Sequence, residues 1–206
     1  WLGPGGDIGA VVSRLTGVPL VVSVHGSDVF VAERHRITHQ AVRLALRSSC
    51  HLIACSGDLA RRVVRLGMPS DRVSVVPYGV DVERSRPDQG PTQNLRTTLQ
   101  IPDGQHVIMA MGRLVYKKGF SYLIKAMPGV LARCPDSVLL IAGQGDLGAD
   151  LEQLAESLGI GQQVIFAGHV AWDQTPAYLA LADVLVLPSI LDQAGNVDGL
   201  PNVLLE

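Results

Sequence analysis

Short apolar runs rich in β-branched residues alternate along the chain with segments that repeat apolar residues at helical spacing. The runs predicted to be strands cover residues 18–26, 51–57, 71–79, 106–112, 137–143, 164–168 and 183–189. The segments predicted to be helices cover residues 57–68, 120–131, 148–158 and 175–183. Strands that are apolar on both faces and alternate with helices are typical of a parallel sheet covered on both sides. We therefore predict the α/β class, and we expect the 183–189 strand to be the most clearly buried.

The ends of the predicted helices carry their own signals. Ser56 is the expected N-cap of the first helix, and Gly67 is its expected C-cap. In the second helix, apolar residues from Phe120 to Leu131 recur at offsets of 0, 3, 4, 7, 10 and 11, which places them on one face. Pro201 favours the start of a further helix near the end of the chain.

Residues 82–104 differ in character from the rest of the chain. The stretch is polar and contains three prolines, which indicates an exposed connection. It separates two α/β units, residues 1–81 and residues 105–206. The first unit lacks an expected beginning and the second an expected end, and the chain begins with Trp1 rather than methionine. We expect the sequence to be a piece of a longer protein.

Composition narrows the function classes. The chain has 206 residues, 47% of them hydrophobic and 17% charged, which predicts a buried core. A net charge of −2 argues against a large cationic surface for nucleic acid. Three cysteines are an odd number and match no zinc spacing, so a reducing, cytoplasmic location fits best. The apolar runs are too short to span a bilayer.

Polar and glycine residues follow most of the predicted strands. Ligands of open α/β sheets bind beyond the carboxyl ends of the strands, so these residues mark a candidate rim. Gly112, Arg113 and Lys118 follow the 106–111 strand and surround the start of the next helix. Two cations beside free helix N–H groups can bind an anion, and a diphosphate is the favoured ligand. The alternative interpretation is a pair of solvated surface charges.

Gly143 and Gly145 lie in the next strand-to-helix turn. They do not complete the G-x-G-x-x-G pattern of dinucleotide-binding proteins, because Gly148 falls one position late. The turn also does not follow the first strand of a unit. The pattern therefore gives weak support to a nicotinamide site.

Two acids stand near the end of the chain, Asp198 and Glu206, with seven residues between them. Backbone N–H groups from Gly199 through Leu200 to Asn202 are expected to face the ligand. Carboxylates repel a diphosphate but accept hydrogen bonds from sugar hydroxyls, so the two acids can hold two different sugars of one ligand. The alternative makes Asp198 a turn residue and Glu206 an ordinary acid on a helix.

His25 follows the first predicted strand and precedes a glycine. In a cleft it can donate a hydrogen bond to a substrate hydroxyl or phosphate. The alternative is a structural histidine. The other histidines have no supporting pattern and stay unassigned.

Seven motifs in order resemble glycosyltransferases of family 4, also described as glycosyl transferases group 1. They are HGSD at 25–28, PYGVD at 77–81, GRLVYKKGF at 112–120, IAGQGDL at 141–147, FAGHV at 166–170, DVLVLPS at 183–189 and GNVDGLPNVLLE at 195–206. The resemblance covers almost the whole chain. It implies the GT-B fold, in which two Rossmann-like domains face each other across a cleft.

The resemblance also implies an activity and a set of site residues. The family transfers a sugar from a nucleotide sugar to an acceptor with retention of configuration. The implied catalytic residues are His25, Arg113, Lys118 and Asp198. The implied donor-binding residues are Gly112, Arg113, Lys118, Gly143, Gly145, Gly199, Leu200 and Glu206. No metal or other cofactor is expected, because the two cations take the place of a metal at the diphosphate.

Two departures from the family pattern stand out. Asp198 occupies the first position of the usual E-x7-E pattern and is one methylene shorter than glutamate, which bears on donor contact and rate. Tyr78 stands where the interdomain turn often has asparagine, and we expect it to affect only that turn. Because of Asp198, a non-catalytic nucleotide-sugar-binding protein is an alternative interpretation. A GT-B epimerase or phosphorylase is a further alternative, which the loop before Glu206 disfavours.

The expected partners are a nucleotide-sugar donor, most readily a UDP- or GDP-sugar, and an acceptor of unknown kind. No nucleic acid is expected. We expect a cytoplasmic protein. A further expectation is peripheral contact with the inner face of the membrane, made by an N-terminal part outside this sequence.

Overall fold

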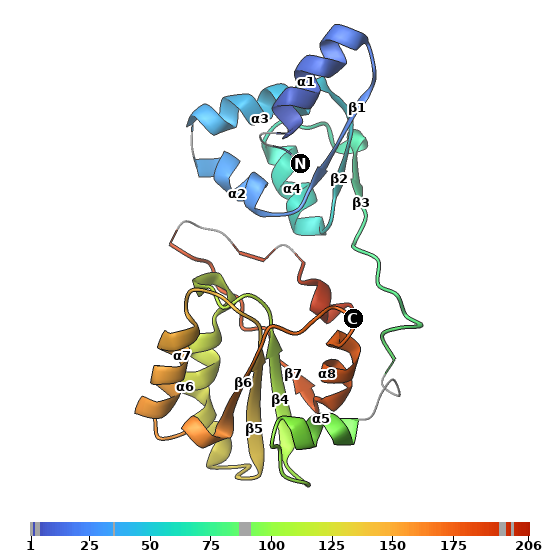
Figure 1. The fold of residues 1–206 in the computed structure, drawn as a ribbon. Coiled ribbons are helices and arrows are strands. Elements are labelled where there is room, and N and C mark those ends of the chain that lie inside the picture. Colours follow the sequence, from blue (N-terminus) through green and yellow to red (C-terminus); the bar gives the residue numbers. More distant parts are fainter. Residues whose placement is uncertain (1, 3–4, 35, 87–91, 194–196, 199) are drawn as a thin grey trace. The chain divides into compact units, whose positions relative to one another are not determined.

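The computed structural model describes residues 2, 5–34, 36–86, 92–193, 197–198 and 200–206 (Figure 1). The chain divides into two compact units. Unit 1 comprises Trp1–Gly79 and Leu191–Pro201, and unit 2 comprises Val80–Ile190 and Asn202–Glu206. Both units contain a parallel sheet with packed helices, which confirms the predicted α/β class. Within the described residues, no helix combines the length and the apolar character needed to cross a bilayer.

Unit 1 has a three-stranded parallel sheet in the order β1-β2-β3. The strands are β1 (Leu20–Val24), β2 (Ser49–Ala54) and β3 (Val73–Val75). The helices are α1 (Gly5–Thr16), α2 (Ser27–Arg34), α3 (Arg36–Ser48), α4 (Gly57–Arg65) and a 3₁₀ turn, Ser70–Arg72. Alternate strand residues such as Val22, Val24 and Leu52 enter one core with residues of α2, α3 and α4. Period-two alternation therefore directs one face of this sheet into the core.

The first predicted helix forms as α4, with the predicted cap at its start. The hydroxyl of Ser56 accepts a hydrogen bond from the backbone N–H of Leu59 at 3.4 Å. Gly67 adopts a positive φ of 106° directly after the C-cap Leu66, a conformation that favours glycine. Helix α4 thus begins and ends where short-range sequence signals predict.

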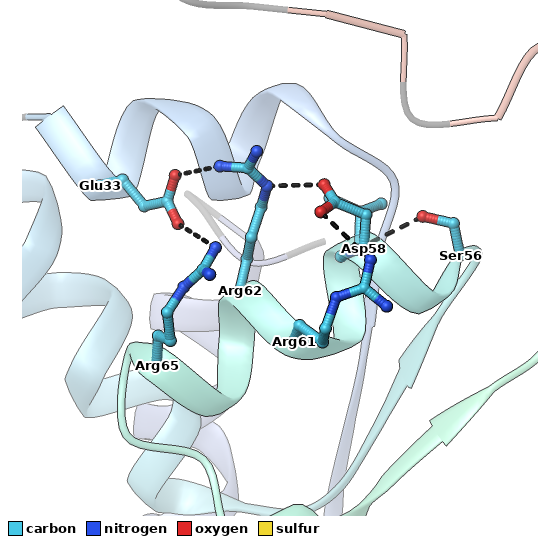
Figure 2. Close-up of polar contacts among 7 residues, drawn as sticks. Glu33, Ser56, Asp58, Arg61, Arg62 and Arg65 are labelled. Carbon is cyan, nitrogen blue, oxygen red and sulfur yellow. Dashed lines mark hydrogen bonds and ion pairs between the residues drawn. The ribbon is translucent and has the colours of Figure 1, made fainter.

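A polar network on α4 ties this helix to α2 (Figure 2). Arg62 donates to Asp58 and to Glu33, each at 2.7 Å, and its guanidinium lies 4.7 Å from the ring centre of Phe30. Because the guanidinium is always charged and hydrogen-bonded to the carboxylate, the pKa of Asp58 is lowered. Arg62 is therefore the centre of the network.

We expect Arg62→Ala to lower the free energy of unfolding of unit 1 by about 1–2 kcal/mol, because it removes two charged hydrogen bonds and a cation–π contact that solvent partly screens. Asp58 contributes stability above its ordinary pKa of 3.8, and this contribution is lost as the pH falls through its lowered folded-state pKa. The difference in the free energy of unfolding between the parent protein and Arg62→Ala should therefore become smaller in acid. Chemical denaturation at pH 7 and in acid measures both effects.

Arg61→Ala is the matched control for this measurement. Arg61 is 71% exposed and lies 3.6 Å from Asp58 in a single ion pair. Its loss should change the free energy of unfolding by less than about 0.5 kcal/mol. Equal effects of the two substitutions would show that the network adds no stability of its own.

Unit 2 has a four-stranded parallel sheet in the order β6-β5-β4-β7. The strands are β4 (His106–Met111), β5 (Ser137–Ala142), β6 (Val164–Gly168) and β7 (Val184–Leu185). The helices are α5 (Thr92–Thr98), α6 (Phe120–Leu131), α7 (Gly148–Ser157) and α8 (Thr175–Leu181). Three 3₁₀ turns cover Tyr116–Lys118, Gly161–Gln163 and Asn202–Leu204.

Helices cover both faces of this sheet, with α6 and α7 on one side and α5 and α8 on the other (Figure 1). Leu139 and Ile141 of β5 enter the core that contains α6 and α7. Val138 and Leu140 of the same strand enter the core beside α5 and α8. Every residue of β5 is buried. The prediction of a sheet covered on both sides is therefore confirmed for unit 2.

Two segments of unit 2 differ from the sequence predictions. Residues 82–104 include α5, and Leu95, Leu99 and Ile101 pack against the unit 2 core, so this stretch is not an exposed connection along its whole length. The 183–189 run forms a strand only over Val184–Leu185, and Val184 is 54% exposed. The prediction that this strand is the most clearly buried is wrong, because β7 pairs with β4 alone among the described strands and lies at the edge of the sheet.

Candidate functional site

The loops after β4 and β5 form the rim of the unit 2 sheet. The N–H of Gly112 donates to the carbonyl of Ala142 at 2.9 Å, and the N–H of Leu114 donates to the carbonyl of Gln144 at 2.9 Å. Leu114 is buried. Backbone hydrogen bonds therefore hold the two loops together before any ligand binds.

The glycines predicted in these loops allow the backbones to approach closely. A Cβ atom on Gly143 would lie 1.8 Å from the carbonyl oxygen of Gly112, and one on Gly145 would lie 2.5 Å from that of Leu114. The φ of Gly143 is +147°, and its N–H donates to the carbonyl of Gly168 at 2.7 Å, which joins the loop after β6 to the rim. Gly143 and Gly145 thus have a packing role, because only glycine allows these loops to approach so closely.

A hollow of ≈ 190 Å³ opens at this rim. It is lined by Met111, Gly112, Arg113, Ala142, Gly143, Gln144, His169 and Val170. Three predicted donor-binding residues therefore line one cavity. Lys118 lies beside it, because a Cβ on Gly112 would be 3.3 Å from the Cε and 3.5 Å from the Nζ of Lys118.

The hollow lies at the carboxyl ends of β4, β5 and β6, and the strand order reverses next to it, between β4 and β7. Chain order runs from β4 outward through β5 to β6 and then returns to β7 on the other side of β4. In open α/β sheets, such a reversal creates the crevice in which ligands bind. The N–H of Ile190, beyond β7, donates to the carbonyl of Lys117 at 2.8 Å, so the loops after β4 and β7 meet there.

His169 lines the hollow, although the sequence alone assigned it no role. Its position directly after β6 is the same signal that identified Gly112 and Gly143 after their strands. The same signal could therefore have identified His169 from the sequence.

The residues predicted near the chain end are distributed over both units. Asp198 belongs to unit 1, where its neighbours Val197 and Leu200 pack against the unit 1 core. Gly199 lies outside the described residues. Arg113 belongs to unit 2, so the grouping of Asp198 with Arg113 stays a prediction.

Glu206 belongs to unit 2 but lines a different hollow, with Arg86, Leu179 and other residues of α8 and the 85–86 segment. The helix predicted to start at Pro201 is confined to one turn, a 3₁₀ turn over Asn202–Leu204. So few residues do not propagate a stable helix. The structure therefore does not bring Glu206 to the hollow that contains Arg113.

His25 follows β1 in unit 1 and contacts side chains through both ring nitrogens. Its Nδ1 lies 2.6 Å from the hydroxyl of Tyr78, and its Nε2 lies 3.1 Å from the Oγ of Ser23. The two rings are nearly parallel, with an interplanar angle of 3° and a centroid distance of 5.6 Å. The expectation that Tyr78 affects only its turn is wrong, because its hydroxyl bonds a predicted catalytic residue.

Two family models match the chain. The model described as Glycosyl transferases group 1 matches residues 91–206, and the model described as Glycosyltransferase Family 4 matches residues 3–84. Together they cover both units.

Curated relatives match along most of the chain. The uncharacterized glycosyltransferase MJ1607 of Methanocaldococcus jannaschii is 31% identical over 201 residues, which cover 92% of this chain and 50% of that protein. The GDP-mannose-dependent alpha-(1-6)-phosphatidylinositol monomannoside mannosyltransferase of Mycolicibacterium smegmatis is 30% identical over 200 residues, which cover 97% and 52%. The chain spans about half the length of these relatives.

Solved structures share the fold. The structure of Anabaena Alr3699/HepE in complex with UDP and glucose matches with a TM-score of 0.74 and 26% identity, over 89% of this chain and 50% of that chain. Sucrose-phosphate synthase from Thermosynechococcus elongatus matches with a TM-score of 0.76 and 21% identity, over 96% and 50%. These likenesses confirm the predicted GT-B fold class.

Proposed function

Because the chain belongs to the Glycosyl transferases group 1 family, we propose that the protein transfers a sugar from a nucleoside-diphosphate sugar to an acceptor. The observation that carries this proposal is the rim of unit 2, where Gly112, Arg113 and Gly143 line one hollow beyond the carboxyl ends of the strands, with Lys118 beside it. A pre-formed cavity with cationic side chains suits a diphosphate.

The two cations have a direct chemical use in this reaction. Negative charge grows on the leaving diphosphate as the glycosidic bond breaks. Arg113 offers a planar fork of N–H donors, and Lys118 offers a compact positive charge. Cationic side chains at the rim stabilise that charge as it develops, which lowers the barrier. This supply of positive charge supports a mechanism that needs no metal ion.

For the two sugars of the donor we assign His25 as a hydrogen-bond donor and Asp198 as a contact of the transferred sugar. We assign Glu206, which lines the second hollow of unit 2, as a contact of the ribose. Transfer proceeds with retention, by attack on the face from which the diphosphate leaves. The leaving phosphate then accepts the proton of the acceptor hydroxyl. The order of the family motifs supports these assignments.

The donor class is a UDP- or GDP-sugar. One structural neighbour holds UDP and glucose, and one relative is named as GDP-mannose-dependent. We propose a cytoplasmic location, where such donors are available. Asp198 in place of glutamate supports one second candidate, a protein that binds the donor without transferring its sugar.

Incubation of the full-length protein with UDP-glucose and GDP-mannose separates the two candidates. We expect slow donor hydrolysis in the absence of acceptor, with the released sugar first appearing in the α configuration of the donor by proton NMR. The rate should be unchanged by EDTA. Binding of the donor without any release of sugar, and a large gain in release on Asp198→Glu, would favour the non-catalytic candidate. Release of the β anomer would contradict retention.

A further inference from the structure

A tyrosine in unit 1 contacts the predicted catalytic histidine. Tyr78 lies three residues beyond β3, and His25 lies directly beyond β1, so the carboxyl ends of two strands bring them together. The hydroxyl of Tyr78 is 2.6 Å from Nδ1 of His25, and the two rings are nearly parallel, with centroids 5.6 Å apart. Contacted at Nδ1 by Tyr78 and at Nε2 by Ser23, the imidazole has little freedom to rotate.

The hydroxyl of Tyr78 keeps its proton at neutral pH. Burial raises the pKa of Tyr78, and the neighbouring Cys55 thiol and the charge of Asp28 raise it further. A neutral phenol has a proton to donate, and Nδ1 of a neutral imidazole can accept it. The imidazole proton then lies on Nε2, from which it can be donated to the Oγ of Ser23, 3.1 Å away.

We propose that Tyr78 is a positioning residue for His25, which it holds in one orientation with the proton on Nε2, ready for donation to a substrate oxygen. This inference rests on the proposed function, in which His25 contacts the transferred sugar. A substrate hydroxyl replaces Ser23 as the acceptor when the donor binds. The tyrosine therefore acts through the histidine and does not itself need to touch the substrate.

A purely structural tyrosine would have the same surroundings, because Tyr78 also packs against the unit 1 core. Tyr78→Phe separates the two roles, since phenylalanine keeps the ring and its packing and removes only the hydroxyl. A structural role predicts little change. A positioning role predicts that in Tyr78→Phe the proton of His25 distributes between both ring nitrogens.

The direct test is the ¹⁵N NMR spectrum of histidine-labelled full-length protein, with the His25 signals assigned from their loss in His25→Gln. We expect the Nε2–H form in the parent protein and a mixture of the two neutral forms in Tyr78→Phe. Tyr122→Phe is the matched control, because it removes the hydroxyl of a tyrosine that is 52% exposed in unit 2. An unchanged His25 tautomer in Tyr78→Phe would overturn the proposal.

Kinetics provide the second test. Tyr78→Phe should lower kcat by about three- to tenfold, as expected for one lost hydrogen bond, with the donor KM within about twofold. In a His25→Ala background the same substitution should have no further effect. An equal loss of kcat in that background would overturn the proposal. If the parent protein transfers no sugar, the proposed function fails, and the NMR spectrum alone decides the role of Tyr78.

Discussion

Replacement of Arg113 by alanine in the full-length protein is expected to lower kcat for sugar transfer by about 100- to 1,000-fold. Arg113 lines the hollow at the rim of unit 2 with Gly112 and Gly143. Its guanidinium would face the diphosphate at the moment when that group gains charge. Loss of a group that stabilises the transition state more than the ground state lowers kcat more than it raises KM. Steady-state kinetics with saturating acceptor measures both constants.

Two further variants sharpen this result. Arg113→Lys keeps the charge but removes the planar fork, so it should recover only part of the lost rate. Arg133→Ala removes an exposed arginine of the same unit beyond the end of α6, and it should leave the kinetics unchanged. A rate for Arg113→Ala within twofold of the parent rate would remove Arg113 from the proposed mechanism.

Gly143→Ala is expected to destabilise unit 2 by about 3–5 kcal/mol, because it combines backbone strain with a steric clash. The new Cβ would lie 1.8 Å from the carbonyl oxygen of Gly112, and the φ of +147° disfavours any side chain. Relief of the clash requires the loops after β4 and β5 to separate. Denaturation followed by circular dichroism measures the loss of stability.

Gly129→Ala is the matched control for this substitution. Gly129 lies within α6, has no positive φ, and a Cβ there would meet no atom within 4 Å. Alanine at such a helical position should increase stability by about 0.5–1 kcal/mol. A Gly143→Ala protein as stable as the parent would mean that the two loops do not depend on close approach.

Sequence reasoning located the rim because its signals are local. A parallel strand brings its last residue to a defined edge of the sheet, so Gly112, Gly143 and Gly168 could each be placed from the end of an apolar run. Ser56 and Gly67 mark the ends of α4 for the same reason, since each acts within one helical turn.

The features that sequence reasoning missed depend on contacts between distant residues. The bond between Tyr78 and His25 joins residues 53 positions apart, and nothing in either local sequence indicates it. Helix α5 has only seven residues in a polar setting, and it is held by the packing of Leu95 and Leu99 rather than by a strong periodic pattern. Strand β7 was predicted to be buried because its sequence is apolar. Its position at the edge of the sheet depends on the strand order, which the local sequence does not indicate.

Hydrogen exchange of the full-length protein with and without UDP tests the central claim most directly, namely that the rim of unit 2 binds a nucleoside diphosphate. We predict slower exchange on addition of UDP or GDP in the segments around 112–114, 143–145 and 168–170, and loss of this protection in Arg113→Ala. Exchange that is unaffected by either nucleotide, or protection confined to segments away from these loops, would contradict the account.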